Sequence, residues 1–348
     1  MRVTQPFDFA QGHEPVEWQM DAFHQPDGGN DMDDTLKRLS DQISSEISKV
    51  IMGQKEAVTF LLVSLLSRGH VLLEGVPGLG KTLLAKTLAF ILRAEFTRIQ
   101  FTPDMMPADV LGTQVYDLQN RSFRFRKGPL FTEILLADEI NRTPPKTQAA
   151  LLEAMEERQV SIDGKTVPLS ENFFVMATQN PIEQEGTYPL PEAQLDRFFM
   201  KILLGYPSAQ EEREILGRYG KSGNPHDLEK AGLKRLPEGE WISRLRKQVT
   251  EVKVEEGIIG YVQSLLEQSR HSPYLYLGAS PRGGIALLRS SQCLAAMEGR
   301  GYITPDDIKR LALPVLRHRI ILRPEAELEG LTPDHVIARI LEGIPVPR

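Results

Sequence analysis

Behind a short apolar run and ahead of a helical segment, the chain reads Val71-Leu72-Leu73-Glu74-Gly75-Val76-Pro77-Gly78-Leu79-Gly80-Lys81-Thr82. Residues 75–82 match the phosphate-binding pattern G-x-x-x-x-G-K-T, in the strand–loop–helix context that this pattern requires. In such a loop the glycines let backbone N–H groups converge on a phosphate at the N-terminus of a helix. We predict that Lys81 bridges the β- and γ-phosphates of ATP and that the Thr82 hydroxyl binds Mg²⁺.

Two adjacent carboxylates, Asp138 and Glu139, end the apolar run at 134–137. An ending of this kind places both at the carboxyl edge of a sheet, where the phosphate loop also opens. Asp138 suits the Mg²⁺ shell through water, and Glu139 suits a general base that polarises the attacking water. A transferase with a bound acceptor does not need such a base, so the pair favours ATP hydrolysis.

Further apolar runs repeat the pattern of residues 71–73 and are separated by helical segments such as 144–157. They cover residues 96–101, 134–137, 173–177 and 198–204. Continuous apolar runs between helices are typical of parallel strands buried on both faces. The first part of the chain is therefore predicted to be an α/β fold, a parallel sheet sandwiched by helices.

Beyond Pro207 helical patterns dominate, after a polar connection at 221–239. The expected helices cover 241–252, 256–270, 281–298, 305–315 and 333–341. Ser280, Thr304 and Thr332 each precede a proline, which matches a side-chain cap with proline at the first helical position. The predicted organisation is a disordered tail (1–33), an α/β nucleotide-binding domain (34–206) with an insertion at about 101–130, a linker (207–240) and a small all-helical lid domain (241–348).

Composition narrows the class of protein. A chain of 348 residues is longer than chains that usually fold around a single hydrophobic core, so more than one domain is expected. Its 41% hydrophobic and 25% charged residues are ordinary for a globular protein. The net charge of −6 gives no overall attraction to nucleic acid or anionic lipid.

The single cysteine, Cys293, excludes an internal disulfide or a cysteine-based zinc site, and we interpret it as a buried structural thiol in a reducing compartment. No signal peptide or membrane-spanning run is apparent, so a cytoplasmic protein without stable membrane insertion is expected.

Three further polar residues stand at the ends of expected elements. Asn180 follows the run at 173–177 and suits hydrogen bonding to the attacking water or the γ-phosphate. Arg197 lies just before the run at 198–204, and Arg282 lies at the start of an expected lid helix. Taken singly, each arginine is more typical of a solvated surface charge.

The order of these motifs resembles the AAA+ ATPases and, among them, the MoxR family, over about residues 35–345. The residues that carry the resemblance are Gly53-Gln54, Gly75 to Thr82, Asp138-Glu139-Ile140-Asn141-Arg142, Pro144-Pro145-Lys146-Thr147-Gln148, Leu152-Glu153-Ala154-Met155, Thr178-Gln179-Asn180-Pro181, Leu195-Asp196-Arg197-Phe198 and Ser280-Pro281-Arg282. In combination they form a highly specific signature.

The resemblance also implies roles for individual residues. Asn180 would be the first sensor, Arg197 the finger that reaches the ATP of a neighbouring subunit, and Arg282 the second sensor, acting on its own nucleotide or a neighbour's. The adenine would be bordered by Ile51, Gly53 and Gln54. The phosphates would be held by Gly75, Pro77, Gly78, Leu79, Gly80, Lys81, Thr82 and Leu83.

For the whole protein the resemblance implies a hexameric ring that remodels or matures a client protein in a chaperone-like way, with a partner that carries a von Willebrand factor A domain. One alternative is a magnesium chelatase ATPase subunit, whose motifs are nearly the same. Another is a DNA-remodelling motor, against which the acidic composition argues. A nucleotide-gated scaffold without turnover is less consistent with the presence of Glu139, Asn180 and Arg197.

The connection at 101–130 is longer than is usual between strands. Val115-Tyr116 and Phe123-Arg124-Phe125-Arg126 flank the segment 117–122, which predicts a β-hairpin with its phenylalanines on one face and its arginines on the other. In the resembled family this is the position of the helix-2 insert, which points toward the axial face of the ring. The hairpin is consistent with contact to a client or partner and equally with local packing.

Overall fold

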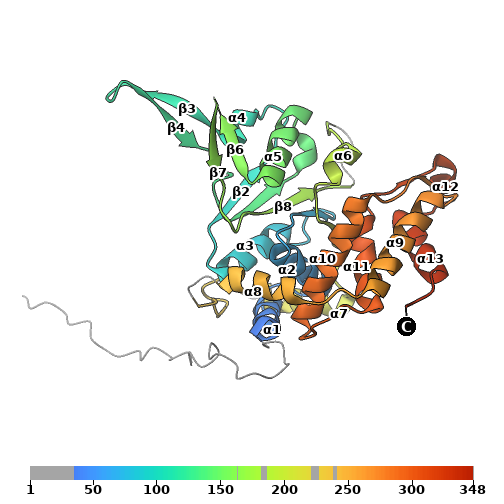
Figure 1. Ribbon diagram of the computed structural model, residues 1–348. Coiled ribbons are helices and arrows are strands. Elements are labelled where there is room, and N and C mark those ends of the chain that lie inside the picture. Colours follow the sequence, from blue (N-terminus) through green and yellow to red (C-terminus); the bar gives the residue numbers. More distant parts are fainter. Residues whose placement is uncertain (1–34, 163, 182–185, 221–226, 238–240, 348) are drawn as a thin grey trace, which may run out of the picture.

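A computed structural model describes residues 35–162, 164–181, 186–220, 227–237 and 241–347. The predicted tail, residues 1–33, lies outside these ranges. The described part consists of an α/β unit with a bundle of helices beside it and a two-stranded arm that projects from the α/β unit (Figure 1).

The central sheet is parallel, as predicted. Its strands, in spatial order, are β2 (Phe96–Gln100), β5 (Ile134–Asp138), β8 (Phe174–Gln179), β1 (Val71–Glu74) and β9 (Met200–Leu203). Because all strands run the same way, the segments that follow β1, β5 and β8 emerge at one edge of the sheet as neighbours. The segment that precedes β9 enters at the opposite edge.

Both faces of the sheet are covered, which explains why the three inner strands β1, β5 and β8 are apolar over most of their length. Val71 and Leu73 pack on the face covered by α1 (Thr35–Ser48), α2 (Lys55–Leu66) and α3 (Lys81–Leu92). Leu72 packs on the other face, with α5 (Pro145–Glu157). The side chains of a strand alternate between faces, so one sequence run supplies two cores.

Several short elements accompany this frame. They are α4 (Pro107–Leu111), the 3₁₀ helix η2 (Ile140–Arg142), the hairpin of β6 (Gln159–Ile162) and β7 (Lys165–Pro168), and α6 (Glu192–Leu195). The helix α4 and the β6–β7 hairpin were not predicted.

The arm is the hairpin predicted at 115–126. It pairs β3 (Gly112–Asp117) with β4 (Ser122–Lys127), and Tyr116 stands directly opposite Phe123 with ring centroids 5.2 Å apart. Gly112 has a φ of 103°, and a Cβ there would lie 2.4 Å from the Arg126 carbonyl oxygen, so the base of the arm requires glycine. Phe123 and Phe125 share one face, and Arg124 and Arg126 share the other, as predicted.

The lid contains α8 (Trp241–Glu251), α9 (Glu256–His271), α10 (Pro281–Met297), α11 (Pro305–Leu316), α12 (Pro324–Leu328) and α13 (Pro333–Gly343). It also contains a two-stranded sheet that was not predicted, β10 (Leu275–Leu277) with β11 (Ile321–Leu322). The Thr304 and Thr332 hydroxyls accept the expected cap hydrogen bonds from the backbone N–H of Asp307 and His335. Ser280 is the N-cap residue of α10, but its hydroxyl makes no cap bond.

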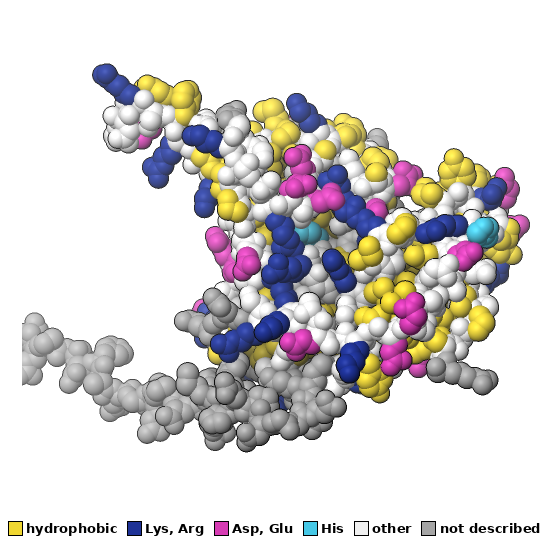
Figure 2. Space-filling view, in the orientation of Figure 1, with side chains coloured by type: hydrophobic (Ala, Val, Ile, Leu, Met, Phe, Trp, Pro, Cys, Tyr) yellow, Lys and Arg dark blue, Asp and Glu magenta, His cyan; other side chains and the backbone are white. Residues whose placement is uncertain are grey.

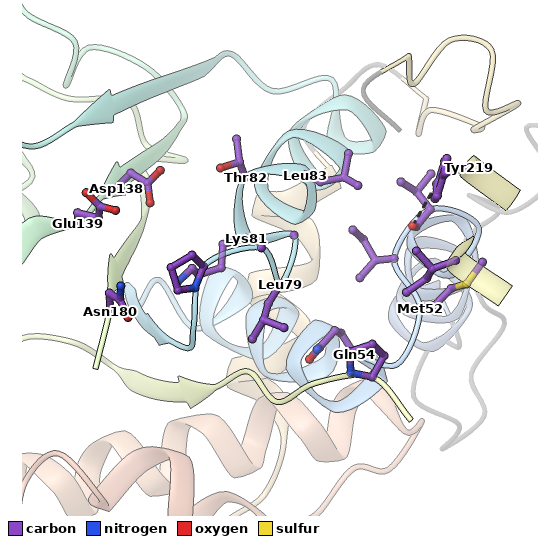
Figure 3. A pocket seen from close by; sticks show the side chains of 17 residues that line it. Met52, Gln54, Leu79, Lys81, Thr82, Leu83, Asp138, Glu139, Asn180 and Tyr219 are labelled. Carbon is purple, nitrogen blue, oxygen red and sulfur yellow. Dashed lines mark hydrogen bonds between the residues drawn. The ribbon is translucent and has the colours of Figure 1, made fainter. Parts of the chain in front are cut away.

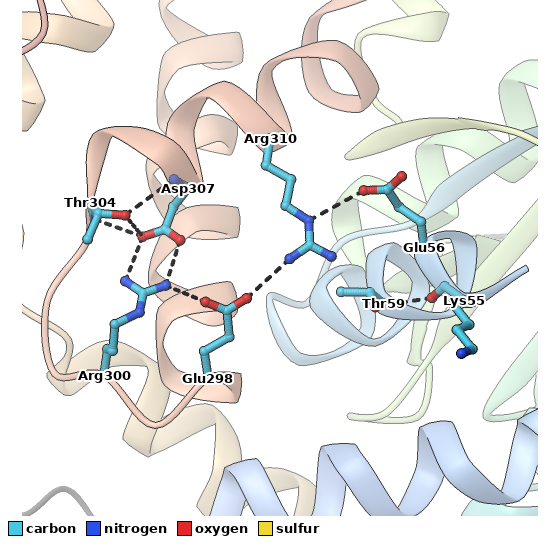
Figure 4. Close-up of polar contacts among 8 residues, drawn as sticks. All are labelled: Lys55, Glu56, Thr59, Glu298, Arg300, Thr304, Asp307 and Arg310. Carbon is cyan, nitrogen blue, oxygen red and sulfur yellow. Dashed lines mark hydrogen bonds and ion pairs between the residues drawn. The ribbon is translucent and has the colours of Figure 1, made fainter.

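Apolar packing holds the lid to the α/β unit, because residues of α2, α8 and α10 belong to one buried cluster. One ion pair extends this contact (Figure 4): Arg310 of the lid contacts Glu56 of α2 at 3.4 Å, and it also pairs within the lid with Glu298 at 3.1 Å. Exposed pairs of this kind contribute only about 0–1 kcal/mol. Arg300, by contrast, binds Asp307 and so ties the cap of α11 to the end of α10.

One sequence prediction was incomplete. The range 207–240, predicted as a linker, contains α7 (Ala209–Tyr219). Ser208 and Glu211 form a reciprocal capping box at its start, the Ser-x-x-Glu pattern that marks a helix N-terminus.

The interpretation of Cys293 as a buried thiol is confirmed, since its side chain is inaccessible to solvent and burial raises its pKa to about 12. Across the described ranges, every helix is too short or too polar to cross a membrane.

Candidate active site

A cavity of about 620 Å³ opens where β1, β5 and β8 end. Its lining is made of Val50, Ile51, Met52, Gln54, Pro77, Gly78, Leu79, Gly80, Lys81, Thr82, Leu83, Asp138, Glu139, Asn180, Pro207, Ile215 and Tyr219. Figure 3 shows the labelled carboxylates and Asn180 at one end, Met52 and Tyr219 at the other, and Lys81 and Thr82 between them. Polar groups therefore gather at the strand ends, and apolar groups gather at the far end.

The loop between β1 and α3 supplies the floor of the cavity. Gly78 and Gly80 have φ values of 89° and 78°, a left-handed conformation that glycine adopts without strain. The Lys81 ammonium donates to the Gly75 carbonyl at 2.5 Å, so its charge lies over the loop. Thr82 follows in the first turn of α3, with its hydroxyl beside the same cavity.

Asp138 is held in a fixed orientation at the end of β5. Its Oδ1 accepts from the Thr178 hydroxyl at 2.6 Å, and its Oδ2 accepts from the Arg98 guanidinium at 2.7 Å. Thr178 lies on the neighbouring strand β8, and Arg98 lies on β2. The carboxylate is therefore buried but paired on both oxygens, which compensates the cost of removing its charge from water.

Glu139 turns away from the strand with a φ of 57°, and its backbone N–H donates to the Thr178 hydroxyl at 2.9 Å. Its Oε2 accepts from the Gln100 amide at 2.6 Å and pairs with Arg142 at 2.9 Å. Gln100 is the last residue of β2, so it reaches Glu139 from the far side of β5. The predicted base is thus engaged by two donors in this arrangement.

The far end of the cavity contains residues that sequence reasoning missed. Val50 and Met52 flank the predicted Ile51, while Ile215 and Tyr219 come from α7, and Pro207 precedes that helix. The Gln54 amide donates to the Gly205 carbonyl at 3.0 Å. This hydrogen bond links the segment that contains Ile51 to the segment that leads into α7. The capping box at Ser208 was the signal that could have revealed α7, although not where the helix packs.

Of the predicted phosphate and adenine residues, Gly75 and Gly53 stand outside the cavity lining. Gly75 is the first residue of the loop, and its carbonyl accepts the hydrogen bond from the Lys81 ammonium. Gly53 lies between two lining residues with a φ of 74°, and a Cβ there would come within 2.8 Å of the Glu211 carboxylate. Both glycines therefore shape the backbone next to the cavity.

The two predicted arginines lie elsewhere. Arg197 precedes β9 and therefore lies at the sheet edge opposite the phosphate loop; the next residue but one, Phe199, donates its backbone N–H to the carbonyl of His70, which precedes β1. Arg197 and Arg282 share one carboxylate, Glu156 of α5, at 3.2 Å and 2.6 Å. Sequence reasoning identified both arginines but not Glu156, which brings them together.

The described ranges hold no group of three or more His, Cys, Asp or Glu side chains placed to bind a metal ion together. Asp138, at the end of β5, and Thr82, in the first turn of α3, bring side-chain oxygen atoms to the same cavity. Water or a bound molecule would complete the ligand shell of an ion there.

Comparison with known proteins gives a consistent result. The family described as "ATPase family associated with various cellular activities (AAA)" matches residues 70–200, and the AAA lid domain matches residues 267–340. The chain is 46% identical to the uncharacterized protein YeaC of Bacillus subtilis, over 90% of this chain and 96% of that protein. It is 43% identical to the chaperone MoxR1 of Mycobacterium tuberculosis, over 87% and 81% of the two chains. The crystal structure of a putative ATPase from Cytophaga hutchinsonii, 40% identical, superposes with a TM-score of 0.82 over 90% of this chain and 96% of that one.

Proposed function

The chain belongs to the MoxR family of AAA+ ATPases, and from this membership we propose that it couples Mg·ATP hydrolysis to the remodelling of a client protein. The observation that carries the proposal is the convergence of a phosphate loop, two carboxylates and a polar amide on one cavity. Its volume of about 620 Å³ lies in the range of about 300–1,000 Å³ usual for small-molecule sites. ATP is the substrate that this set of groups fits.

ATP would lie with its phosphates over residues 75–82 and its adenine against the apolar end of the cavity. Val50, Ile51 and Tyr219 offer apolar surface there, and Gln54 offers a side-chain amide. The phosphate end offers the N-terminus of α3 and the Lys81 ammonium, both suited to negative charge. The polarity of the cavity thus matches the polarity of a nucleotide.

For hydrolysis we assign Glu139 as the general base and Asn180 as the residue that orients the attacking water. The contacts of Gln100 and Arg142 both fall on Glu139 Oε2, so neither occupies Oε1, which can accept the proton from that water. Lys81 would balance the charge that develops on the γ-phosphate. Each of these roles is supported by a position beside the same cavity.

Magnesium suits the donors present, because Thr82 and Asp138 provide oxygen ligands, and this ion is usually bound by one or two carboxylates together with substrate phosphates. When bound, Mg²⁺ neutralises charge on the phosphates. Thr82 and Asp138 are therefore the proposed metal residues.

We assign both Arg197 and Arg282 to the ATP of a neighbouring subunit in a ring, which the family resemblance implies is hexameric. Three observations support this assignment. Arg197 lies at the edge of the sheet opposite its own phosphate loop, the two arginines share Glu156, and about half of the Arg282 side chain is exposed. Two arginines presented together at the surface suit a phosphate that arrives from outside the subunit.

The client would be engaged through the β3–β4 arm. Leu118 and Phe123 near its tip are 82% and 69% exposed, and Figure 2 shows basic and hydrophobic side chains close together along the arm. The relative named as a chaperone supports a remodelling role, and the family resemblance adds a partner with a von Willebrand factor A domain. A cytoplasmic location is part of this proposal.

Lys81→Ala tests the ATP site. The loss of a charge-assisted contact worth about 1.5–3 kcal/mol should weaken ATP binding by about 10- to 100-fold. The melting temperature should not change, because Lys81 contributes no core packing. Titration with a fluorescent ATP analogue measures the affinity, and Lys86→Ala, on the exposed face of the same helix, is the matched control. Equal affinity in Lys81→Ala and the parent would contradict the assignment.

Replacement of Arg124 and Arg126 by alanine tests the role of the arm. Both are exposed, so basal ATPase activity should stay within about twofold, as expected for surface changes. Affinity capture from the native source with a Glu139→Gln trap should recover a partner, and recovery should fall when the arm is altered. Lys37→Ala with Arg38→Ala, which removes two exposed charges from α1, should not reduce it. If the arm variant recovers as much partner as the variant altered at Lys37 and Arg38, the arm has only a structural role.

A further inference from the structure

A side chain of the lid holds the loop that carries Arg197 by several hydrogen bonds. Arg319, just beyond the end of α11, is 7% exposed, and its guanidinium enters the loop between α6 and β9. Its Nε donates to Asp196 Oδ1 at 2.7 Å, and its Nη2 donates to the Phe198 carbonyl at 2.7 Å. Further bonds reach the carbonyls of Asp196 at 3.3 Å and Phe199 at 3.2 Å. The residues on both sides of Arg197 are therefore fixed by one side chain of the lid.

The two preceding residues make parallel contacts. His318 is buried, and its Nε2 lies 3.0 Å from the same Phe198 carbonyl. Burial lowers the pKa of His318 well below its usual value, so the ring is neutral, and Nε2 carries the hydrogen because a carbonyl only accepts. Arg317 donates to the Lys201 carbonyl at 3.3 Å, inside β9, and pairs with Asp334 of α13. Three consecutive lid residues, 317–319, thus contact the chain from residues 196–199, which we call the finger loop, into strand β9.

The chemistry of Arg319 is more specific than packing requires. Burial lowers the pKa of Arg319, which indicates the cost of desolvating its charge, and Asp196 opposes that cost. An apolar residue could fill the same space without this cost. A guanidinium instead offers five donors in a rigid planar fork, which fixes the carbonyls and the carboxylate in one geometry. A lysine at this position could not reproduce that fork.

The same loop connects to the second arginine. Asp196 lies 4.0 Å from Arg282 in addition to its contact with Arg319, and Glu156 joins Arg282 to Arg197. The chain of charges therefore runs from the end of α11, through the finger loop, to the start of α10. Both of its ends belong to the lid, so a movement of the lid would carry the finger loop with it.

We propose that Arg319 is a positioning residue that couples the lid to the finger, so that the lid sets how Arg197 is presented to the ATP of the neighbouring subunit. This rests on the proposed function, in which Arg197 acts in trans. Arg319 itself touches no nucleotide; it acts through the backbone and the carboxylate of the loop. Loss of its fork should damage the subunit as a donor of the finger and leave the same subunit intact as an acceptor.

Mixed rings separate these two roles. Arg197→Ala subunits are acceptors, with an intact ATP pocket and no finger, and Lys81→Ala subunits are donors, with a finger and a weakened ATP pocket. The ATP concentration is set so that it fills the intact pockets only. Acceptors mixed with donors should hydrolyse ATP. Adding Arg319→Lys to the donors should lower that activity by about 10²-fold, the usual cost of misplacing a catalytic group by about 1 Å. Adding it to the acceptors should have no effect.

The chain offers a matched control, because Arg317→Lys makes the same substitution two residues away, at a side chain that contacts Lys201 and Asp334 but not residues 196–199. This change in the donors should leave activity unaltered. If Arg319→Lys does not fold, Asp196→Asn in the donors removes the carboxylate that pairs with Arg319 and makes the same test.

Each result has one reading. Full activity with Arg319→Lys donors overturns the proposal, and so does an equal loss with Arg319→Lys acceptors, since that indicates a general structural defect. Inactive rings from plain donors and acceptors that exchange subunits remove the trans role of Arg197 itself. These control rings contain no change at Arg319. Their inactivity would therefore contradict the proposed function of Arg197 and not the role of Arg319.

Discussion

Arg197→Ala is expected to bind ATP as tightly as the parent and to hydrolyse it about 10³- to 10⁵-fold more slowly, the effect of losing an arginine finger in comparable enzymes. Binding should survive because Arg197 stands outside the lining of its own cavity. Hydrolysis should slow because Arg197 would no longer help to stabilise the charge that develops on the γ-phosphate of the neighbour's ATP. Single-turnover kinetics with saturating ATP measure the chemical step directly.

Complementation decides whether this arginine acts across the subunit boundary. Rings of Arg197→Ala and Lys81→Ala subunits should recover activity, because one kind supplies the pocket and the other supplies the finger. Arg289→Ala, an exposed arginine two turns along α10 from Arg282, should behave as the parent. Failure of complementation in rings that exchange subunits would falsify the trans assignment and remove the main argument for an obligate oligomer.

Glu139→Gln is expected to retain ATP and to lose about 10²- to 10⁴-fold in turnover, the usual contribution of a general base. Glutamine keeps the shape of the side chain and a carbonyl oxygen that can accept from Gln100, but an amide cannot take a proton from water. The ion pair with Arg142 would also be lost, so the melting temperature should be recorded beside the rate.

The control for this variant is Glu157→Gln, which changes an exposed carboxylate at the end of α5. Measuring kcat and the ATP affinity separately distinguishes a lost base from a damaged pocket. A kcat within a few-fold of the parent would show that a group other than Glu139 activates the water. A parallel loss of ATP affinity would place Glu139 in binding.

Much of the site could be predicted because its parts are local. The phosphate loop is contiguous in sequence, and Asp138 and Glu139 follow an apolar strand directly. Parallel strands deliver their carboxyl ends to one edge, so the three strand-end motifs had to meet once the sheet formed. The alternation of apolar residues likewise determined two buried faces, which the structure has.

The rest depended on contacts between distant segments. Gln100 reaches Glu139 only because β2 lies beside β5, and nothing in the spacing of the two residues indicates this hydrogen bond. Tyr219 and Ile215 enter the cavity because α7 folds back over it. Helix α7 is amphipathic and capped, so the helix could have been predicted from the sequence. The surface against which it packs could not.

The sequence by itself therefore determined the fold class, the family and the groups that we propose contact the phosphates. These features follow from periodicity and from motifs whose residues are neighbours along the chain. Tertiary structure alone decided that Glu156 joins Arg197 to Arg282 and that Arg319 holds the finger loop. Arg319 and Asp196 are 123 residues apart, and a contact over that separation has no period or spacing to mark it. Only the packing of the lid on the sheet brings the two side chains within hydrogen-bonding distance.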